Sequence, residues 1–184
     1  MPDRRDISGA RGYDHREEGG DILMASPVIL EPLTKEKLEE ARGIQREDIS
    51  EEFVDGIDTL WELTQYGEEH SCIGRTFLIR YEGKCAGVLL LGEAIPWETD
   101  PPQMRERPFY RLMGFVLDRK FRNLGIGGQA LELAIESVYC EFGKRPIALG
   151  VHRDNSGAER FYLRHGFRKT AYMEGNDYYF LRSI

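Results

Sequence analysis

The stretch from Arg111 to Ala134 changes from the hydrophobic pattern of a strand to that of a helix. Residues 112–117 form a nearly continuous apolar run, which is typical of a strand covered on both faces. Charged residues within 118–122 end this run. The apolar positions that follow recur at roughly helical spacing, at Leu131, Ala134, Ile135, Val138 and Phe142. The pattern predicts a buried strand, a short basic and glycine-rich loop, and an amphipathic helix.

Upstream, the pattern predicts one strand followed by two helices. A strand-like run covers residues 27–31, and Thr34 can cap a helix that continues through Ala41. Asp48 or Ser50 can cap the second helix. The face shared by that helix would carry Phe53, Ile57, Leu60, Trp61 and Thr64.

A β-hairpin and a proline-rich connection lie between these helices and the central strand. The runs 75–81 and 84–91 are separated by a Glu-Gly pair and predict the hairpin. Four prolines within residues 93–108 block regular structure there, so we expect a long ordered loop near an opening. Its acids could recognise a basic acceptor, or the segment could be a solvated connector anchored by Trp97. The acids concerned are Glu93, Glu98, Asp100 and Glu106.

Beyond the central helix the pattern predicts a strand, a helix and a final hairpin. The strand covers residues 146–151, and the helix covers 156–165 and ends at Gly166. The hairpin joins runs 168–173 and 178–181.

Three glycines lie where the central helix begins, namely Gly125, Gly127 and Gly128. Glycine lets backbone amides approach a ligand closely, and the first turn of a helix attracts anions through its free N–H groups and its dipole. Three nearby cations, Arg119, Lys120 and Arg122, add positive charge. These residues favour a phosphate site, although glycines after a strand could equally form a tight turn.

Two other phosphate motifs fit less well. Gly125, Gly127 and Ala130 satisfy G-x-G-x-x-A, but the acidic residue expected about twenty positions later in a dinucleotide fold falls near Ile147, inside an apolar strand. Too few residues follow to complete such a sheet. No G-x-x-x-x-G-K-[ST] motif occurs, which excludes a P-loop.

A second motif follows the strand at 146–151. The pattern Arg122-x-x-Gly125-x-Gly127 precedes Asn155-x-x-Ala158-x-x-Phe161-Tyr162-x-x-x-Gly166-Phe167. In this order and at this separation the two resemble the GNAT superfamily of acetyl-CoA-dependent N-acetyltransferases. The resemblance covers roughly residues 28–184, with its specific motifs in the C-terminal half.

The resemblance implies an α/β (α+β) fold. The expected architecture is a central, mostly antiparallel twisted sheet of about seven strands, splayed at strands 4 and 5 and flanked by about four helices. The N-acetyltransferase domain would cover residues 24–184. Residues 1–21 are nearly devoid of apolar side chains, so residues 1–23 read as a flexible extension, and Met24 is an alternative start.

The resemblance also implies acetyl-CoA as co-substrate and assigns residues to it. Strand backbone at Phe115, Val116 and Leu117 would pair with the pantetheine amides, as an added strand does. Arg122 begins the loop motif, and Asn155 would contact the cofactor arm or cap the helix that starts at Ser156. The backbone amides expected to hold the pyrophosphate belong to Asn123, Leu124, Gly125, Ile126, Gly127 and Gly128. No metal site is expected, because the four histidines have no ligand spacing.

Acetyl transfer to an amine requires one proton to leave the amine and one to reach the departing thiolate. Presenting an amine of pKa near 10.4 as the free base at neutral pH costs on the order of 4 kcal/mol. Tyr162 matches the tyrosine that the superfamily commonly uses as the acid, although it could serve only in packing. The base is open: Arg111 lies where some members carry a glutamate, and Glu93, an ordered water chain or His152 are the alternatives.

The composition narrows the partners. A net charge of −7 argues against a general nucleic-acid binder and favours cationic substrates. Small polyamines are therefore the first candidate acceptors; protein amino termini, lysines and aminoglycosides stay open, as does a non-catalytic acyl-CoA sensor. The apolar run at 86–91 is far too short to span a membrane, and the N-terminus has no signal core, so we expect a cytoplasmic protein without a membrane partner. A homodimer is left open.

Overall fold

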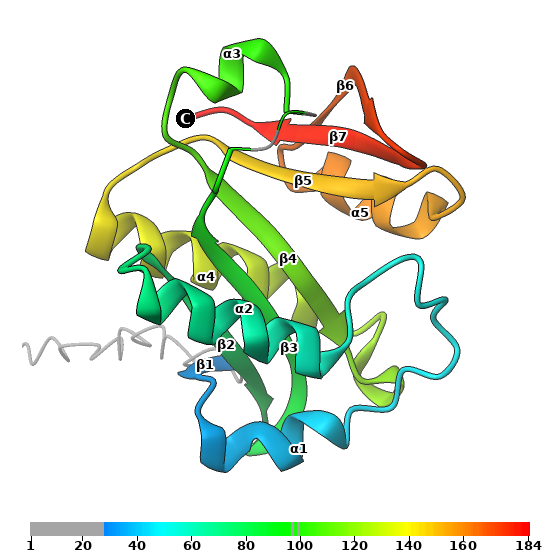
Figure 1. Cartoon of the computed structure of the whole chain (residues 1–184). Helices are drawn as coiled ribbons and strands as arrows, with labels where there is room; N and C mark the ends of the chain where they lie inside the picture. The colour runs from blue at the N-terminus through cyan, green and yellow to red at the C-terminus, as the bar shows by residue number, and fades with distance from the viewer. Residues whose placement is uncertain (1–27, 97, 99) are drawn as a thin grey trace, which may run out of the picture.

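The computed structural model describes residues 28–96, 98 and 100–184 (Figure 1). The extension expected at residues 1–23 and the alternative start at Met24 lie outside the described residues. Seven strands form one sheet in the order β1-β2-β3-β4-β5-β7-β6. The strands are β1 Val28–Pro32, β2 Gly74–Tyr81, β3 Lys84–Glu93, β4 Tyr110–Leu117, β5 Ile147–His152, β6 Arg168–Glu174 and β7 Asp177–Arg182. The helices are α1 Leu38–Arg42, α2 Ile57–Glu69, α3 Pro102–Arg105, α4 Ile126–Phe142 and α5 Ser156–Arg164, with short 3₁₀ turns η1 Lys35–Lys37 and η2 Arg119–Phe121.

The sheet is antiparallel except at its centre. Strands β4 and β5 are parallel, and within the described residues they pair at Tyr110 with Ile147 and at Arg111 with Ala148. Both strands then continue, and Figure 1 shows them diverging. This confirms the expected mostly antiparallel sheet splayed at its fourth and fifth strands.

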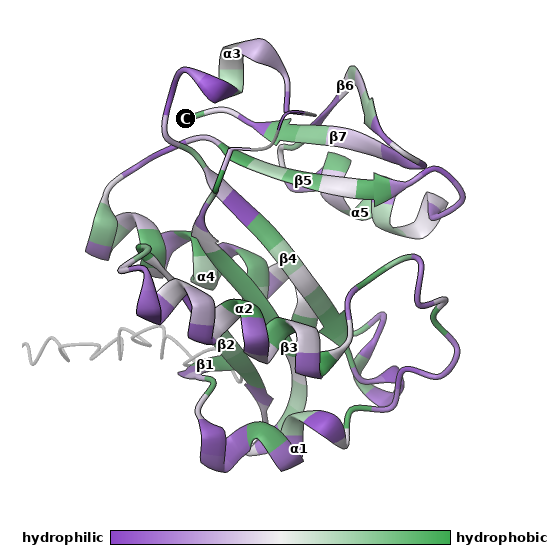
Figure 2. Ribbon diagram, in the orientation of Figure 1, coloured by the Kyte–Doolittle hydropathy of each residue, from purple (hydrophilic) through white to green (hydrophobic). Residues whose placement is uncertain are grey.

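The two faces of the sheet are covered by different helices. Helix α4 packs its stripe, including Leu131 and Ile135, on one face, together with Leu112 of β4. Helices α1 and α2 cover the other face, where Leu60 of α2 packs with Val116 of β4. Figure 2 shows hydrophobic segments concentrated in the central strands and in α4, and hydrophilic ones along the connection between α1 and α2. The two layers of helices enclose the central strands, as a strand apolar on both faces requires.

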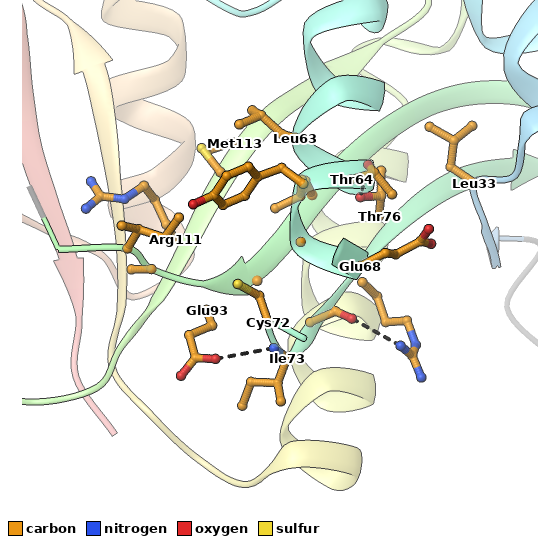
Figure 3. A pocket seen from close by; sticks show the side chains of 18 of the residues that line it. Leu33, Leu63, Thr64, Glu68, Cys72, Ile73, Thr76, Glu93, Arg111 and Met113 are labelled. Atoms are coloured by element: carbon orange, nitrogen blue, oxygen red, sulfur yellow. Dashed lines mark hydrogen bonds between the residues drawn. The ribbon is translucent and has the colours of Figure 1, made fainter. Parts of the chain in front are cut away.

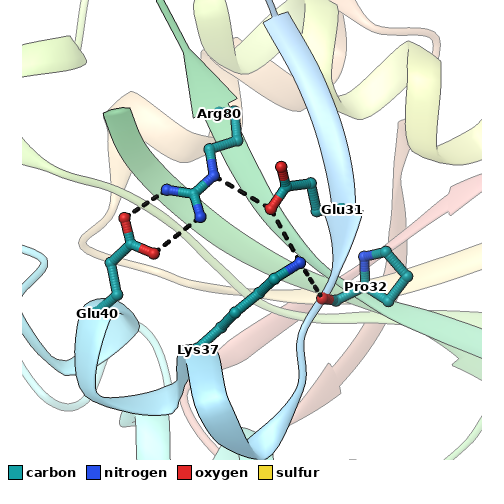
Figure 4. A network of polar contacts seen from close by, with 5 residues as sticks. All are labelled: Glu31, Pro32, Lys37, Glu40 and Arg80. Atoms are coloured by element: carbon teal, nitrogen blue, oxygen red, sulfur yellow. Dashed lines mark hydrogen bonds and ion pairs between the residues drawn. The ribbon is translucent and has the colours of Figure 1, made fainter. Parts of the chain in front are cut away.

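A polar network fixes the first helical segment to the edge of the sheet. Arg80 of β2 donates to Glu31 of β1 at 3.1 Å and to Oε2 of Glu40 in α1 at 2.8 Å (Figure 4). Lys37 pairs with Glu31 at 2.9 Å and holds the pKa of that carboxyl below its ordinary value, although burial acts in the opposite direction. These partly exposed pairs orient α1 rather than contribute much stability.

The prediction of where the second helix begins was wrong. Helix α2 begins at Ile57 after an extended Gly56, so Phe53 lies outside the predicted helix. Its ring instead packs against the imidazole of His152, with centroids 5.0 Å apart. Ile49 and Val54, which precede the helix, pack against the core on the α2 side instead of lying on a shared helix face.

The proline-rich connection is more structured than a solvated loop. It contains the short helix α3, and its Met104 and Phe109 are buried with Ala148 and Tyr179 of the neighbouring strands. The connection therefore covers the sheet where β4 and β5 are still paired. Within the described residues, no helix has the length and apolar character to cross a membrane.

Candidate active site

A cleft of about 270 Å³ lies where β4 and β5 separate. Its lining includes Leu112 and Phe115, which pack toward α4, and Met113, which packs toward α2. Because residues from both faces of β4 line it, the cleft passes through the plane of the sheet. A ligand on the α4 side and a second ligand on the α2 side can therefore meet in it.

A β-bulge shapes the β4 wall. Val88 of β3 lies opposite Val116, whereas Leu90 lies opposite Met113, so β4 carries one extra residue between these pairs. Gly114 occupies this segment with φ 58°, and a Cβ there would lie 2.4 Å from Cδ1 of Leu60. The bulge thus requires glycine both for its backbone conformation and for the close approach of α2.

The loop after β4 brings the start of α4 toward the same strand. Asp118 caps η2 by accepting the N–H of Lys120 at 2.9 Å, and it also accepts the N–H of Gln45 at 2.9 Å. Burial alone would raise the pKa of this carboxyl, but the two backbone donors hold it below its ordinary value. Gly125 then adopts φ 78° immediately before α4. The loop is a fixed structure that presents the first turn of α4.

The glycines in this turn also allow helix packing. A Cβ at Gly128 would lie 2.8 Å from Cε1 of His165, and one at Gly127 would lie 3.3 Å from Cδ1 of Leu117. Part of the glycine pattern in the sequence therefore reflects the close approach of α4 to α5 and β4. This packing role is compatible with free backbone N–H groups at the same turn.

The side chain of Arg122 contacts protein groups. Its Nε donates to the carbonyl of Leu117 at 3.0 Å, its NH1 to Asp48 at 2.6 Å and its NH2 to the carbonyl of Gln45 at 3.3 Å. The Arg122 guanidinium holds the pKa of Asp48 below its ordinary value. Arg122 thus joins the loop between β4 and α4 to the connection between α1 and α2.

Helix α5 contributes two of the predicted residues. Asn155 caps it, with Oδ1 accepting the N–H of Ala158 at 3.0 Å, and also lines the cleft. Tyr162 lines the cleft about two turns later and packs edge-on against Phe161 and Phe167, at centroid distances of 5.1 and 5.4 Å. Burial raises the pKa of the Tyr162 phenol, so it is protonated at neutral pH and can donate a proton.

Five carboxylates line the same cleft on the side away from α4, and the sequence analysis did not single out any of them. They come from the α1–α2 connection and from the β6–β7 hairpin: Glu51, Glu52, Asp55, Glu174 and Asp177. Their segments are more than 100 residues apart in the chain, so no local motif contains them. The acidic composition was the one signal that pointed to them.

Asp177 is the carboxylate placed most closely against the cleft wall. A Cβ at Gly150 of β5 would lie 3.1 Å from its Oδ2, so the missing side chain at that position leaves room for the carboxylate. Burial raises the pKa of Asp177, and Glu174 and Asp55 raise it further, whereas nearby His152 lowers it. A carboxylate with a raised pKa is a stronger base than an ordinary one.

Arg111 is neutralised by an acid from the proline-rich connection. Its NH2 donates to both carboxylate oxygens of Asp100 at 2.8 Å, and the two side chains are only 5% and 0% exposed. Asp100 therefore does not face an acceptor as the sequence had suggested. The buried pair instead fixes the connection over the junction of β4 and β5.

Neither of the other two candidate bases is among the described residues that line the cleft, although His152 lies behind it, beside Glu52 and Phe53. Glu93 accepts from NH1 of Arg145 at 2.9 Å and from the N–H of Ile73 at 3.3 Å, and it lines a different cavity. His152 is 7% exposed and lies 3.8 Å from Glu52, but it is absent from the described residues that line the cleft. Among the described residues, no three His, Cys, Asp or Glu side chains are grouped so that they could hold a metal ion.

The sheet splays beyond the bulged strand β4, and a glycine turn and helix α4 follow that strand. This arrangement defines the acetyltransferase type of α/β fold. The profile of the acetyltransferase (GNAT) family matches residues 38–167. The chain therefore belongs to the GNAT family, and it is an acetyl-CoA-dependent N-acetyltransferase by class.

Solved structures have the same fold at low sequence identity. The PaiA N-acetyltransferase of Thermoplasma acidophilum, in complex with coenzyme A, is 20% identical with a TM-score of 0.57, covering 85% of this chain and 99% of its own. The acetyltransferase of Salmonella typhimurium that modifies the N-terminal serine of ribosomal protein L7/L12 is 16% identical with a TM-score of 0.62, covering 85% and 95%. Arabidopsis thaliana Naa50, with a bisubstrate analogue, is 18% identical with a TM-score of 0.54, covering 86% and 99%. A search of curated proteins found no significant match.

Proposed function

We propose that this protein transfers the acetyl group of acetyl-CoA to a primary amine that arrives as an ammonium ion, with small polyamines as the first class to test. The observation that carries the proposal is the cleft itself. Phe115 and Tyr162 line its α4 side, and the first turn of α4 lies close by, because Gly127 packs near Phe161; its other side is lined by five carboxylates. An anionic co-substrate and a cationic acceptor thus each have a complementary side.

The α4 side is suited to acetyl-CoA. Within the described residues, β4 has no pairing with β5 beyond Arg111, so backbone at Phe115 and Val116 is placed to bond the pantetheine amides. The Leu117 carbonyl already accepts from Arg122, which limits that residue to its N–H. Backbone N–H groups from Asn123 to Gly128 would hold the pyrophosphate. The similar fold of PaiA, crystallised with coenzyme A, supports this use.

The ammonium loses two protons in becoming an amide, one before it attacks and one as the amide forms, and the second restores the Tyr162 phenol after that phenol has protonated the departing sulfur. The amine nitrogen attacks the thioester carbonyl, and the C–S bond breaks as the amide forms. Tyr162 donates its phenolic proton to the departing sulfur, whose thiol has a pKa of roughly 8.5. Its protonated state at neutral pH suits this role.

Asp177 takes the proton from the amine. It lies in the cleft beside Gly150, on the side where the acceptor enters. Its raised pKa lowers the free-energy difference between the ammonium and the protonated carboxyl, so the proton leaves more readily. The remaining acids at this mouth would attract the ammonium from solution.

The function is tested by acetyl-CoA-dependent thiol release with mass spectrometry of the acceptors. The panel is spermidine, an aminoglycoside, a lysine peptide and peptides with free amino termini. The peptides are included because similar folds act on a ribosomal protein N-terminus and bind a peptide-containing analogue. We expect an acetylated primary amine. Tight coenzyme A binding with no acetylated product across the panel would instead indicate a non-catalytic acyl-CoA sensor.

A further inference from the structure

A second and larger cavity, of about 410 Å³, lies on the α2 face of the sheet. Figure 3 shows it between α2 and the central strands, with Leu63 and Thr64 on α2 and Met113 on β4 among its walls. Cavities of about 300–1,000 Å³ are typical of small-molecule sites. The volume is therefore sufficient for a substantial part of a ligand.

This cavity adjoins the cleft. Arg111 and Met113 line both spaces, and they lie two residues apart on the same strand. Met113 packs with the α2-side core, so the shared wall is on the side where the acceptor enters. Along β4, Gly114 lies one residue from Met113 and three from Arg111. At about 3.3 Å per residue, the bulge is about 3–10 Å from this wall. A small molecule that passes the Met113 side chain would extend from the cleft into the cavity.

The lining of the cavity is largely hydrocarbon. Its apolar side chains include Leu33, Leu63, Ile73, Leu90, Ile95 and Met113. A ligand group in contact with these side chains would be stabilised in proportion to the apolar area that it buries.

Several polar groups in the wall are already bonded to the protein, whereas Glu68 lies at the exposed edge of the cavity. The hydroxyls of Thr64 and Thr76 are 2.7 Å apart, and Thr64 also contacts the carbonyl of Leu60. Glu93 is paired with Arg145. A second ammonium placed deep in this space would lose hydration and meet Glu93, whose charge Arg145 already balances, so the interior of the cavity favours an apolar group over a linear polyamine chain.

We propose that this cavity is the subsite for an apolar group of the acceptor, so that the preferred substrate is a primary amine bearing an aromatic or branched aliphatic group on a short linker. The proposal rests on the proposed function, because it assumes that the amine reacts in the cleft. The five carboxylates of the cleft select the ammonium, and the cavity selects the organic group that carries it. The carboxylates alone would favour small polyamines, and the cavity adds a preference for an apolar group, so amines that carry such a group should be better substrates than linear polyamines.

The test compares 3-phenylpropylamine with n-propylamine, which share the same amine and differ in the apolar group. We expect kcat/KM to be at least about tenfold higher for 3-phenylpropylamine, since burying a phenyl group is worth a factor of that order. Leu63→Trp should fill the cavity and reduce this ratio toward one. The KM for acetyl-CoA and the rate with n-propylamine should stay unchanged.

Two further variants keep the test interpretable. Ile29→Trp makes a similar change at a 58% exposed position on the edge strand β1 and should preserve the ratio. Cys72→Phe narrows the same cavity from a partly exposed position and replaces Leu63→Trp if that variant does not fold. A wild-type ratio near one, or an unchanged ratio in folded Leu63→Trp and Cys72→Phe, would overturn the subsite.

Calorimetry separates failure of the subsite from failure of the proposed function. It measures binding of 3-phenylpropylamine to the coenzyme A-loaded protein. Binding that Leu63→Trp abolishes, with no acetylation of any amine, would retain the cavity as an amine site and refute the proposed reaction. Acetylation of amines with no contribution of the phenyl group to binding would instead retain the proposed reaction and refute the cavity as a subsite.

Discussion

The loop that leads into α4 presents mainly backbone and glycines, whereas the acceptor side of the cleft is formed by side chains, many of them acidic. Two carboxylates show the difference. Asp118, at the start of the loop to α4, accepts two backbone N–H groups that hold its pKa below the ordinary value. Asp177, on the acceptor side, has its pKa raised by burial and by neighbouring acids. The first carboxylate stabilises the fold as an anion, and the second is poised to take up a proton.

The largest expected effect is on chemistry at the junction of the two sides. Tyr162→Phe removes the proposed proton donor and should lower kcat by about 10²–10⁴-fold. The acetyl-CoA dissociation constant should stay the same, because the ring still packs against Phe161 and Phe167. Steady-state kinetics and calorimetry measure the two quantities. Tyr172→Phe, at an exposed tyrosine of β6, is the control, and full turnover in Tyr162→Phe would remove the tyrosine from the mechanism.

Asp177→Asn should lower kcat/KM about 10²-fold and remove the acidic limb of its pH profile. In the wild type that limb falls as pH decreases through the raised pKa of Asp177, because the base must be unprotonated. Glu52, Asp55, Glu174 and His152 surround this site and would shift the limb together. Asp177→Glu should restore part of the activity. An unaltered pH profile in Asp177→Asn would assign the proton to another group.

The same substitution should separate activity from stability. A carboxyl whose pKa is raised on folding is destabilising where it is ionised and not where it is protonated. Asp177→Asn should therefore be at least as stable as the wild type at pH 7, and any gain should vanish near about pH 3. Urea unfolding at both pH values measures this. A loss of stability at pH 7 would indicate that Asp177 is a structural residue.

The bulge in β4 is expected to tolerate no side chain. Gly114→Ala places a Cβ against Leu60 in a left-handed conformation and should lower the free energy of unfolding by about 2–4 kcal/mol. Gly83→Ala is a matched control, because Gly83 has φ 76° in a turn with no atom within 4 Å of the added Cβ. It should cost about 1 kcal/mol from backbone strain alone. Equal losses in the two variants would contradict the close approach of α2.

Asp118→Asn should destabilise the protein by about 1–3 kcal/mol at neutral pH, by weakening two charge-assisted bonds to backbone N–H groups. The sign is opposite to that at Asp177. A lowered folded pKa gives stability that is present above the unfolded pKa, near 3.9, and is lost as pH falls through the folded value. Urea unfolding as a function of pH should show the difference between wild type and variant shrinking in acid. A pH-independent difference would point to packing instead of charge.

The sequence predicted much more of the α4 side than of the acceptor side, for physical reasons. The strand, the glycine turn and the helix N-terminus follow one another within residues 112–134, so local periodicity is enough to place them. Asp177 reaches the cleft because β7 pairs with β5 beside Gly150, and this register is set by the whole sheet. Asp100 was expected to face an acceptor but pairs with Arg111, a contact that depends on how the proline-rich connection folds back over β4. Side-chain sites assembled across the sheet are invisible to local patterns.

The smallest effect is expected at the rim of the acidic mouth, where charge is exposed. Glu52 lines the cleft with a side chain that is 76% exposed, so its field is strongly screened. Glu52→Gln should raise KM for a cationic amine by about two- to threefold at low salt, and the effect should disappear toward about 1 M salt, where the Debye length is only about 3 Å. The KM for acetyl-CoA, for which we propose the α4 side, should not change. If instead KM for acetyl-CoA rises and that for the amine does not, the carboxylates do not form the acceptor side, and the two sides of the cleft would have to be exchanged.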